Sequence, residues 1–326
     1  MIVEEIMEKD VYFHRFLKKD GMYEPVGETC DFLPSGFYKP YFNAYDGKYY
    51  LTVKNVVMPK LFILPNGVQD LILKDIYRFW ESEEVYKKFG SVYKRNILLY
   101  SVPGNGKTSL INVIANKLIS EYNGVVIFID SPNDLGAYGT VMERFRQIEP
   151  TRKVLTIIED FERLAKNDDY TALLLQTLDG NAQLSNVVTI ATTNYPESLD
   201  KRFVCRPSRF NLSIEYKKPN DEIRHEYIRL KLAEGGYDIS DEDINRYVAM
   251  TEGYTFDLLK EFVQGIFVDG IDENEIQDRL KQLIDADGNI RINEETTKIG
   301  FSTQIKQKCK EEDCSLNAPC GGRVVD

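Results

Sequence analysis

The chain has 326 residues, which is enough for two or three domains with a substantial core. Apolar residues make up 43% and charged residues 29%, as in an ordinary globular protein. The net charge of −11 argues against indiscriminate binding to nucleic acid, because such binding depends on clustered Lys and Arg.

Membrane and secretory signals are absent from the sequence pattern. No stretch approaches the roughly 18 uninterrupted apolar residues that suggest a membrane span. The start, MIVEEIMEKD, has acids where a secretory signal needs a basic and then an apolar stretch. We therefore expect a cytoplasmic protein without a membrane span.

The five cysteines do not form the pattern of a disulfide scaffold. Cys30 and Cys205 each stand alone in the sequence. Cys309, Cys314 and Cys320 could hold a metal, but their spacing is looser than that of usual zinc pairs and no His lies nearby. A polar tail with reduced thiols is the favoured interpretation, and zinc is the alternative.

The first 65 residues are rich in aromatic and turn residues, and they predict a small β-containing N-terminal region. Alternation in DGKYYLTVKNVVM, which begins with the pair Asp46 and Gly47, predicts a hairpin. Residues 70–90, DLILKDIYRFWESEEVYKKFG, have apolar residues at helical spacing, and Gly90 closes this helix.

Residues 66–218 alternate between apolar strands and amphipathic helices. The strands RNILLY, VVIFID, VLTIIED and NVVTIATTN are nearly continuous apolar runs, which predict a parallel sheet covered by helices on both faces. Residues 219–285 contain four helical patterns, several with Asp, Ser or Thr at the start, and predict a helical lid. Residues 286–326 show little periodicity and are expected to form a polar C-terminal tail.

The stretch NILLYSVPGNGKTSL has the pattern of a phosphate-binding loop between a strand and a helix. Glycines let backbone N–H groups surround a triphosphate, and the helix N-terminus favours its negative charge. The lysine is expected to neutralise the β and γ phosphates, and the hydroxyl of Thr108 to bind magnesium. Ser101 departs from the usual Gly. The predicted nucleotide-binding residues are Gly104, Asn105, Gly106, Lys107, Thr108 and Ser109.

Two acids end the strand in VLTIIEDFERL, at a sheet edge where ligands collect. Glu159 is expected to hold magnesium, directly or through water, because magnesium prefers oxygen ligands and keeps several waters. Asp160 is expected to orient the water that attacks the γ phosphate. The alternative is a pair of solvated charges at the end of a strand. The order is notable, since such sites usually place Asp before Glu.

Three further residues are candidates for catalysis. Asn194 ends the strand VVTIATTN and could sense the γ phosphate, although Asn also forms ordinary turns. Arg206 and Arg209 follow in LDKRFVCRPSRF, and guanidinium groups suit phosphate recognition. If they face a neighbouring subunit they can complete its site, and surface arginines in a loop are the alternative.

These motifs together resemble the AAA branch of the AAA+ ring-forming ATPases over about residues 66–270. SVPGNGKT resembles the Walker A motif, IIED the Walker B motif, LLQTLDG the helix that follows it, and ATTN the first sensor. RPSRF resembles the paired-arginine segment and TEGYTF the start of the lid helix. The family's pore loop presents an aromatic residue before Gly, for which Tyr138 and Gly139 are the nearest match. Packing of Tyr138 within a helix is the favoured interpretation, and the pore loop is the alternative.

Residues around the phosphate loop are also similar to the subgroup of mitochondrial translocases that insert the Rieske protein during complex III assembly. That subgroup writes its acidic motif as Glu then Asp, so the resemblance implies that the inverted pair is a working variant. We expect no counterpart of the subgroup's membrane anchor, because no stretch of this sequence is apolar enough to span a membrane.

The resemblance implies a magnesium-dependent ATPase that binds ATP and forms a homo-oligomeric ring, with a hexamer expected. Hydrolysis would remodel or translocate an unknown protein client. A nucleic-acid motor or clamp loader is one alternative, although the acidic balance counts against it. The second alternative is a nucleotide-gated scaffold that scarcely hydrolyses ATP. Ser101 and the short side chain of Asp160 are the features that support this alternative.

Overall fold

The computed structural model describes residues 15–19, 22–26, 29–56, 64, 68–166, 168–179, 186–204, 206 and 208–292. Contacts divide the chain into two compact units, Met1–Ser35 and Gly36–Asp326. In the first unit, β1 (Arg15–Lys19) and β2 (Met22–Val26) pair as antiparallel strands. The residues described leave out Cys205 and the three cysteines of the tail, so the alternatives for Cys309, Cys314 and Cys320 stay open.

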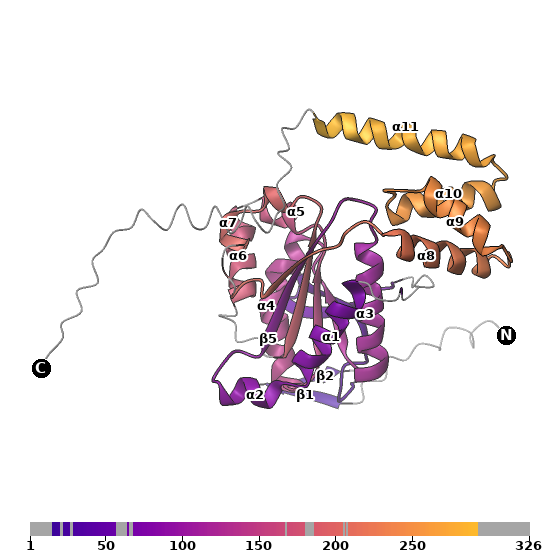
Figure 1. Ribbon diagram of the computed structural model, residues 1–326. Helices are drawn as coiled ribbons and strands as arrows, with labels where there is room; N and C mark the ends of the chain where they lie inside the picture. Colours follow the sequence, from indigo (N-terminus) through magenta and orange to yellow (C-terminus); the bar gives the residue numbers. More distant parts are fainter. Residues whose placement is uncertain are drawn as a thin grey trace, which may run out of the picture. The chain divides into compact units, whose positions relative to one another are not determined.

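A seven-stranded sheet forms the centre of the second unit (Figure 1). Its order is β4-β3-β6-β7-β8-β5-β9, and only β4 runs antiparallel to its neighbour. Every residue of β6, β7 and β8 is buried, as their continuous apolar runs predict. The strands are β3 (Gly36–Asn43), β4 (Lys48–Val53), β5 (Lys94–Tyr100), β6 (Val125–Phe128), β7 (Val154–Ile158), β8 (Val187–Thr193) and β9 (Leu212–Glu215).

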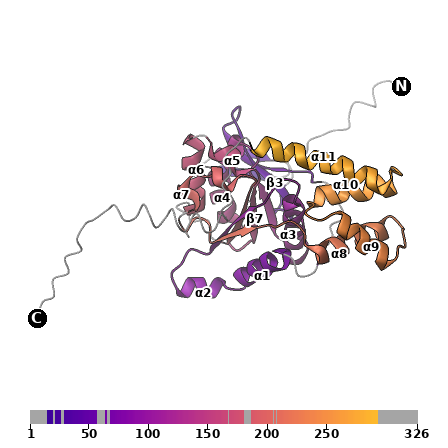
Figure 2. The same cartoon turned by 45° about the horizontal axis from the view of Figure 1, so that its top comes forward.

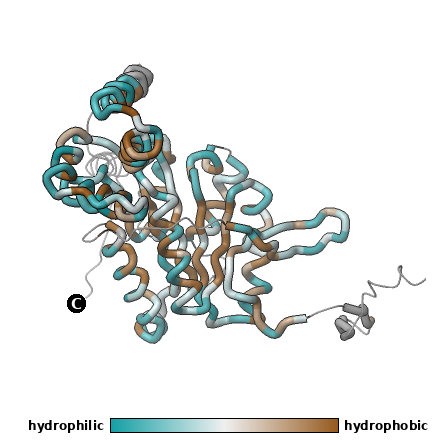
Figure 3. The backbone as a smooth tube through the Cα atoms, turned by 90° about the vertical axis from the view of Figure 1, so that its right-hand side faces the viewer, coloured by the Kyte–Doolittle hydropathy of each residue, from teal (hydrophilic) through white to brown (hydrophobic). Residues whose placement is uncertain are grey.

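Helices cover both faces of the sheet (Figure 1). Helices α1 and α3 lie on one face, where Ile76, Leu110 and Ile114 pack with strand residues such as Ile97 and Val188 in one buried cluster. Helices α4 and α6 lie on the other face, and Figure 3 shows the apolar strands between more polar surfaces. The helices of this core are α1 (Val68–Trp80), α2 (Glu83–Lys88), α3 (Lys107–Tyr122), α4 (Pro132–Ile148), α5 (Phe161–Ala165), α6 (Asp168–Asp179) and α7 (Lys201–Val204), with a 3-10 turn at Pro196–Ser198. The predicted α/β class is therefore confirmed.

The predicted helix over residues 70–90 is two helices in the structure, α1 and α2. The break falls at Ser82, whose hydroxyl donates a hydrogen bond to the carbonyl of Arg78. Serine competes in this way with the helical hydrogen bonds of the backbone, and therefore favours helix ends. Gly90 follows α2 with a φ of +62°, the left-handed conformation that glycine adopts without strain.

The predicted hairpin around Asp46 and Gly47 is present as β3 and β4. Both strands belong to the core sheet, because β3 pairs in parallel with β6 over Gly36–Tyr38. This pairing covers what would otherwise be an open edge of β6. The compact unit that contains the core therefore starts at Gly36, within the region predicted to be separate up to residue 65.

Four helices after the sheet form the lid (Figure 2). They pack around one buried cluster that includes Ile228, Leu259 and Phe262. Asn220 and Thr255 are among the residues that cap these helices with side-chain oxygens, as predicted from the polar residues at their starts. The last helix continues to residue 292, beyond the predicted lid limit of 285. The lid helices are α8 (Asp221–Glu234), α9 (Asp241–Met250), α10 (Phe256–Phe267) and α11 (Glu273–Ile292).

Within the described ranges, no helix has both the length and the apolar character needed to cross a membrane.

Candidate functional site

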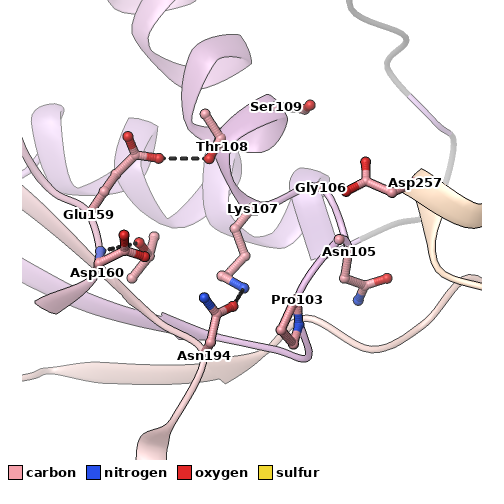
Figure 4. Close-up of a pocket in the computed structure, with 12 residues that line it drawn as sticks. Pro103, Asn105, Gly106, Lys107, Thr108, Ser109, Glu159, Asp160, Asn194 and Asp257 are labelled. Carbon is pink, nitrogen blue, oxygen red and sulfur yellow. Dashed lines mark hydrogen bonds between the residues drawn. The ribbon is translucent and has the colours of Figure 1, made fainter. Parts of the chain in front are cut away.

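A pocket of about 240 Å³ lies at the carboxyl ends of three neighbouring strands, β7, β8 and β5 (Figure 4). Parallel strands direct their carboxyl ends to the same edge, so loops that are far apart in sequence meet there. The pocket brings together the predicted loop residues 104–109 with Glu159, Asp160 and Asn194. Asn194 directly follows strand β8, which lies between β5, which leads into the loop, and β7, which leads into the two acids.

Two glycines give the loop between β5 and α3 its shape. Gly104 and Gly106 have φ values of +72° and +83°, which strain any residue with a Cβ. Gly106 is also the N-cap of α3, and no side chain caps the first N–H groups of this helix. These groups have no partner within the helix, so they remain available for an anionic ligand in the pocket.

Lys107 extends into the pocket from the first turn of α3 (Figure 4). Its Nζ donates hydrogen bonds to Oδ1 of Asn194 and, over 2.9 Å, to Oγ of Ser101. Burial lowers the pKa of the Lys107 ammonium, and the nearby acids Asp160, Glu162 and Glu159 oppose that shift. Ser101 thus fits the loop as a hydrogen-bond partner of the lysine.

Thr108 and Glu159 place two oxygen atoms at the pocket wall. The hydroxyl of Thr108 donates a 2.7 Å hydrogen bond to Oε1 of Glu159. Hydroxyl and carboxylate oxygens are the donors that magnesium prefers. The pair therefore suits a magnesium ion bound beside a triphosphate.

Asp160 follows in a left-handed conformation with a φ of +48°. Its backbone N–H donates a 3.3 Å hydrogen bond to Oγ1 of Thr192 on β8, which fixes the turn at the end of β7. Its carboxylate is half exposed and lies 3.5 Å from Arg163. The carboxylate borders the pocket from which a water molecule would approach the phosphate.

The two predicted arginines do not line the pocket of their own chain. Arg206 is exposed to solvent. The guanidinium of Arg209 is buried and makes two 2.9 Å hydrogen bonds to Asp179, and a third to the carbonyl of Arg202. Arg209 is therefore bound within its own chain in this structure.

Asp257 and Tyr138 also bear on the predictions made from the sequence. Asp257, at the start of α10, lines the pocket but was not predicted; its place directly after TEGYTF was the available signal. Tyr138 is 1% exposed, and its hydroxyl is hydrogen-bonded to Thr156. This tyrosine therefore packs inside the core, as the favoured interpretation predicted, and does not line a pore.

Comparison with known proteins identifies a family for the segment that contains most of the pocket residues. Residues 97–218, which include the phosphate loop, both acids and both arginines, match the family described as "ATPase family associated with various cellular activities (AAA)". This segment is an AAA domain. The predicted relation to AAA ATPases is thereby confirmed, whereas the narrower resemblance to the Rieske-protein translocases stays a prediction.

Curated relatives of the AAA domain come from fungi, archaea and bacteria. An "ATPase family gene 2 protein" of Schizosaccharomyces pombe is 31% identical over 197 residues, 56% of this chain and 24% of that protein. A "Putative 26S proteasome regulatory subunit homolog" of Methanocaldococcus jannaschii is 29% identical over 54% of this chain and 49% of that protein. An "AAA ATPase forming ring-shaped complexes" of Corynebacterium glutamicum is 28% identical over 63% of this chain and 46% of that protein. The chain thus spans less than half the length of these relatives.

AAA ATPases use ATP and magnesium, and the AAA domain described above has fitting groups for both. The uncapped start of α3 and Lys107 suit a triphosphate, and the oxygens of Thr108 and Glu159 suit the metal. Magnesium would neutralise negative charge on the β and γ phosphates when bound there.

Proposed function

We propose that this chain is a magnesium-dependent ATPase that works as a ring and remodels or translocates a protein partner. The observation that carries the proposal is the meeting of Lys107 and Thr108 with Glu159 in one pocket, although Glu159 is 51 residues from Thr108 in sequence. A cation, a hydroxyl and a carboxylate at the N-terminus of a helix match the needs of a metal-bound triphosphate.

Each side chain has a distinct proposed role. Lys107 neutralises the β and γ phosphates, while Thr108 and Glu159 hold the metal. Asp160 orients the attacking water and accepts its proton. Asn194, which bonds to the Lys107 ammonium, exchanges that bond for one to the γ phosphate and so registers its presence.

The ring is proposed because an arginine from a neighbour would supply charge that the pocket lacks. Arg206 is exposed and is the better candidate for this role. Arg209 would instead hold the arginine segment through its ion pair with Asp179. The name of the Corynebacterium relative, which refers to ring-shaped complexes, supports assembly, and a hexamer is the expected form.

A protein client fits this chain better than nucleic acid. The net charge is −11, so the chain offers little general attraction to a phosphate backbone. The identity of the client is not encoded in the pocket. A cytoplasmic location is proposed as well.

Phosphate release from ATP tests the proposal when it is measured against protein concentration, with magnesium and with EDTA. We expect release that requires magnesium and whose rate per chain rises as subunits assemble, with rings in negative-stain images of the same samples. Absence of release from assembled protein would favour the nucleotide-gated scaffold. Strong stimulation by DNA would favour the nucleic-acid motor.

A further inference from the structure

Asp257 joins the lid to the phosphate loop. Its backbone N–H donates a 3.0 Å hydrogen bond to the carbonyl of Gly104. A Cβ placed on Gly104 would lie only 3.0 Å from Oδ2 of Asp257 and 3.2 Å from its Cβ. The aspartate therefore sits directly against the loop, and it lines the same pocket as Lys107.

The Asp257 carboxylate has spare capacity to accept hydrogen bonds. The residue is exposed, and no hydrogen bond or ion pair joins its carboxylate to another residue that the structure describes. An ionised carboxylate accepts hydrogen bonds and donates none. A group in the pocket that carries hydrogen-bond donors can therefore bind to this carboxylate.

The position of Asp257 separates it from the hydrolytic end of the pocket. Figure 4 shows Asp257 on the opposite side of the loop from Glu159, Asp160 and Asn194. The γ phosphate belongs with Asn194 and the two acids, so the chain of phosphates leads from there toward the nucleoside. A carboxylate repels phosphate, and Asp257 is consequently compatible only with the uncharged nucleoside end.

The sugar is the first part of the nucleoside beyond the α phosphate, and its hydroxyls are donors. Carboxylates bind ribose hydroxyls in this way in other nucleotide sites. We propose that Asp257 accepts a hydrogen bond from the ribose 2′-hydroxyl and makes the pocket selective for ribonucleotides over 2′-deoxyribonucleotides. This inference rests on the proposed ATPase function. It also gives the lid helix α10 a direct contact with the bound nucleotide.

Calorimetric titration with ATP and with 2′-deoxy-ATP tests this proposal in the full chain with magnesium. We expect the wild type to bind ATP about tenfold more tightly, because a hydrogen bond to a charged group contributes on this scale. Asp257→Ala should lower ATP affinity to that of 2′-deoxy-ATP and leave the deoxynucleotide unaffected. Asp257→Asn, which keeps an acceptor oxygen, should retain part of the preference. Asp269→Ala, an exposed acid just beyond α10, should behave as the wild type.

Several results would overturn the ribose contact while leaving the ATPase proposal intact. These are equal affinity of the wild type for both nucleotides, a preference that survives Asp257→Ala, or a gain in affinity for both nucleotides in that variant. A changed ratio of ATP to GTP affinity with an unchanged sugar preference would assign Asp257 to the base and also overturn it. Failure of the wild type to bind either nucleotide would overturn the ATPase proposal itself, and the ribose contact with it.

Discussion

The hydroxyl of Thr108 donates a 2.7 Å hydrogen bond to Oε1 of Glu159, and this bond links the first turn of α3 to the end of β7. The two residues come from different loops, so their meeting depends on the parallel register of β7, β8 and β5. Two oxygens this close, in the same pocket as Lys107, define where the proposed metal would bind relative to the phosphates.

Glu159→Gln removes the proposed metal ligand's charge and keeps its shape. We expect ATP affinity in magnesium to fall about tenfold, since a carboxylate binds magnesium better than an amide. Affinity measured in EDTA should not change, because no metal is then involved. Calorimetry under both conditions checks this, with the exposed Glu197→Gln as control. An equal loss in EDTA would show that Glu159 acts on the loop rather than on a metal.

Asp160→Asn should keep ATP binding and stop hydrolysis, because the amide cannot accept the proton of the attacking water. The fold should be unaffected, since Asn tolerates the left-handed conformation found at this position. Single-turnover phosphate release, together with calorimetry, measures both effects. Undiminished turnover would assign the water to another residue.

Asp160→Glu tests why the acids stand in this order. The φ of +48° is strained for Glu, and we expect a loss of about 1 kcal/mol in the free energy of unfolding in urea. Asp160→Gly should match or exceed the wild type in the same measurement, because glycine adopts positive φ freely. A Glu variant as stable as the wild type would remove this backbone explanation.

Substitution of the two arginines should have different effects on stability and on hydrolysis. Arg209→Ala removes the buried guanidinium that pairs with the carboxylate of Asp179. We expect the free energy of unfolding to fall by about 3 kcal/mol. Arg206→Ala should change stability by no more than about 0.5 kcal/mol, because the residue is exposed, yet it should impair hydrolysis in assembled protein. Urea unfolding and phosphate release distinguish the two. Equal destabilisation by both substitutions would contradict the assignment.

Lys107 should make stability depend on alkaline pH. Burial lowers its pKa in the folded chain below the ordinary value of 10.5, so the folded state carries a cost for the charged amine. That cost is complete below the lowered pKa and fades as pH rises toward 10.5, so the lysine's contribution to stability becomes more favourable with rising pH. The stability of the wild type relative to Lys107→Met should therefore rise as the pH rises toward 10.5. A constant difference would show that this lysine does not titrate in that range.

Local pattern was sufficient for the phosphate loop. Gly104, Gly106, Lys107 and Thr108 lie within five consecutive residues, and their immediate neighbours predict the strand, the turn and the helix. The position of Asn194 between the loop and the acids required strand order, which the pattern of one strand does not contain. The same limit hid the pairing of β3 with β6, which brings the predicted hairpin into the core sheet.

Other features depended on backbone conformation and on contacts distant in sequence. The left-handed turn at Asp160 accounts for the unusual order of the acids, because Asp tolerates positive φ better than Glu and Glu159 still reaches Thr108. The engagement of Arg209 with Asp179 depends on packing between segments 30 residues apart. Neither feature leaves a periodic signal in the sequence.

Calorimetric titration of ATP with magnesium into wild-type protein and into Lys107→Met tests the central claim most directly. The claim is that a triphosphate binds on the loop from Gly104 to Thr108, so we predict one ATP per chain in the wild type and at least about a hundredfold weaker binding in the variant. Lys88→Ala, an exposed lysine on α2, should bind as the wild type does. Equal affinity of the wild type and Lys107→Met for ATP would contradict the claim.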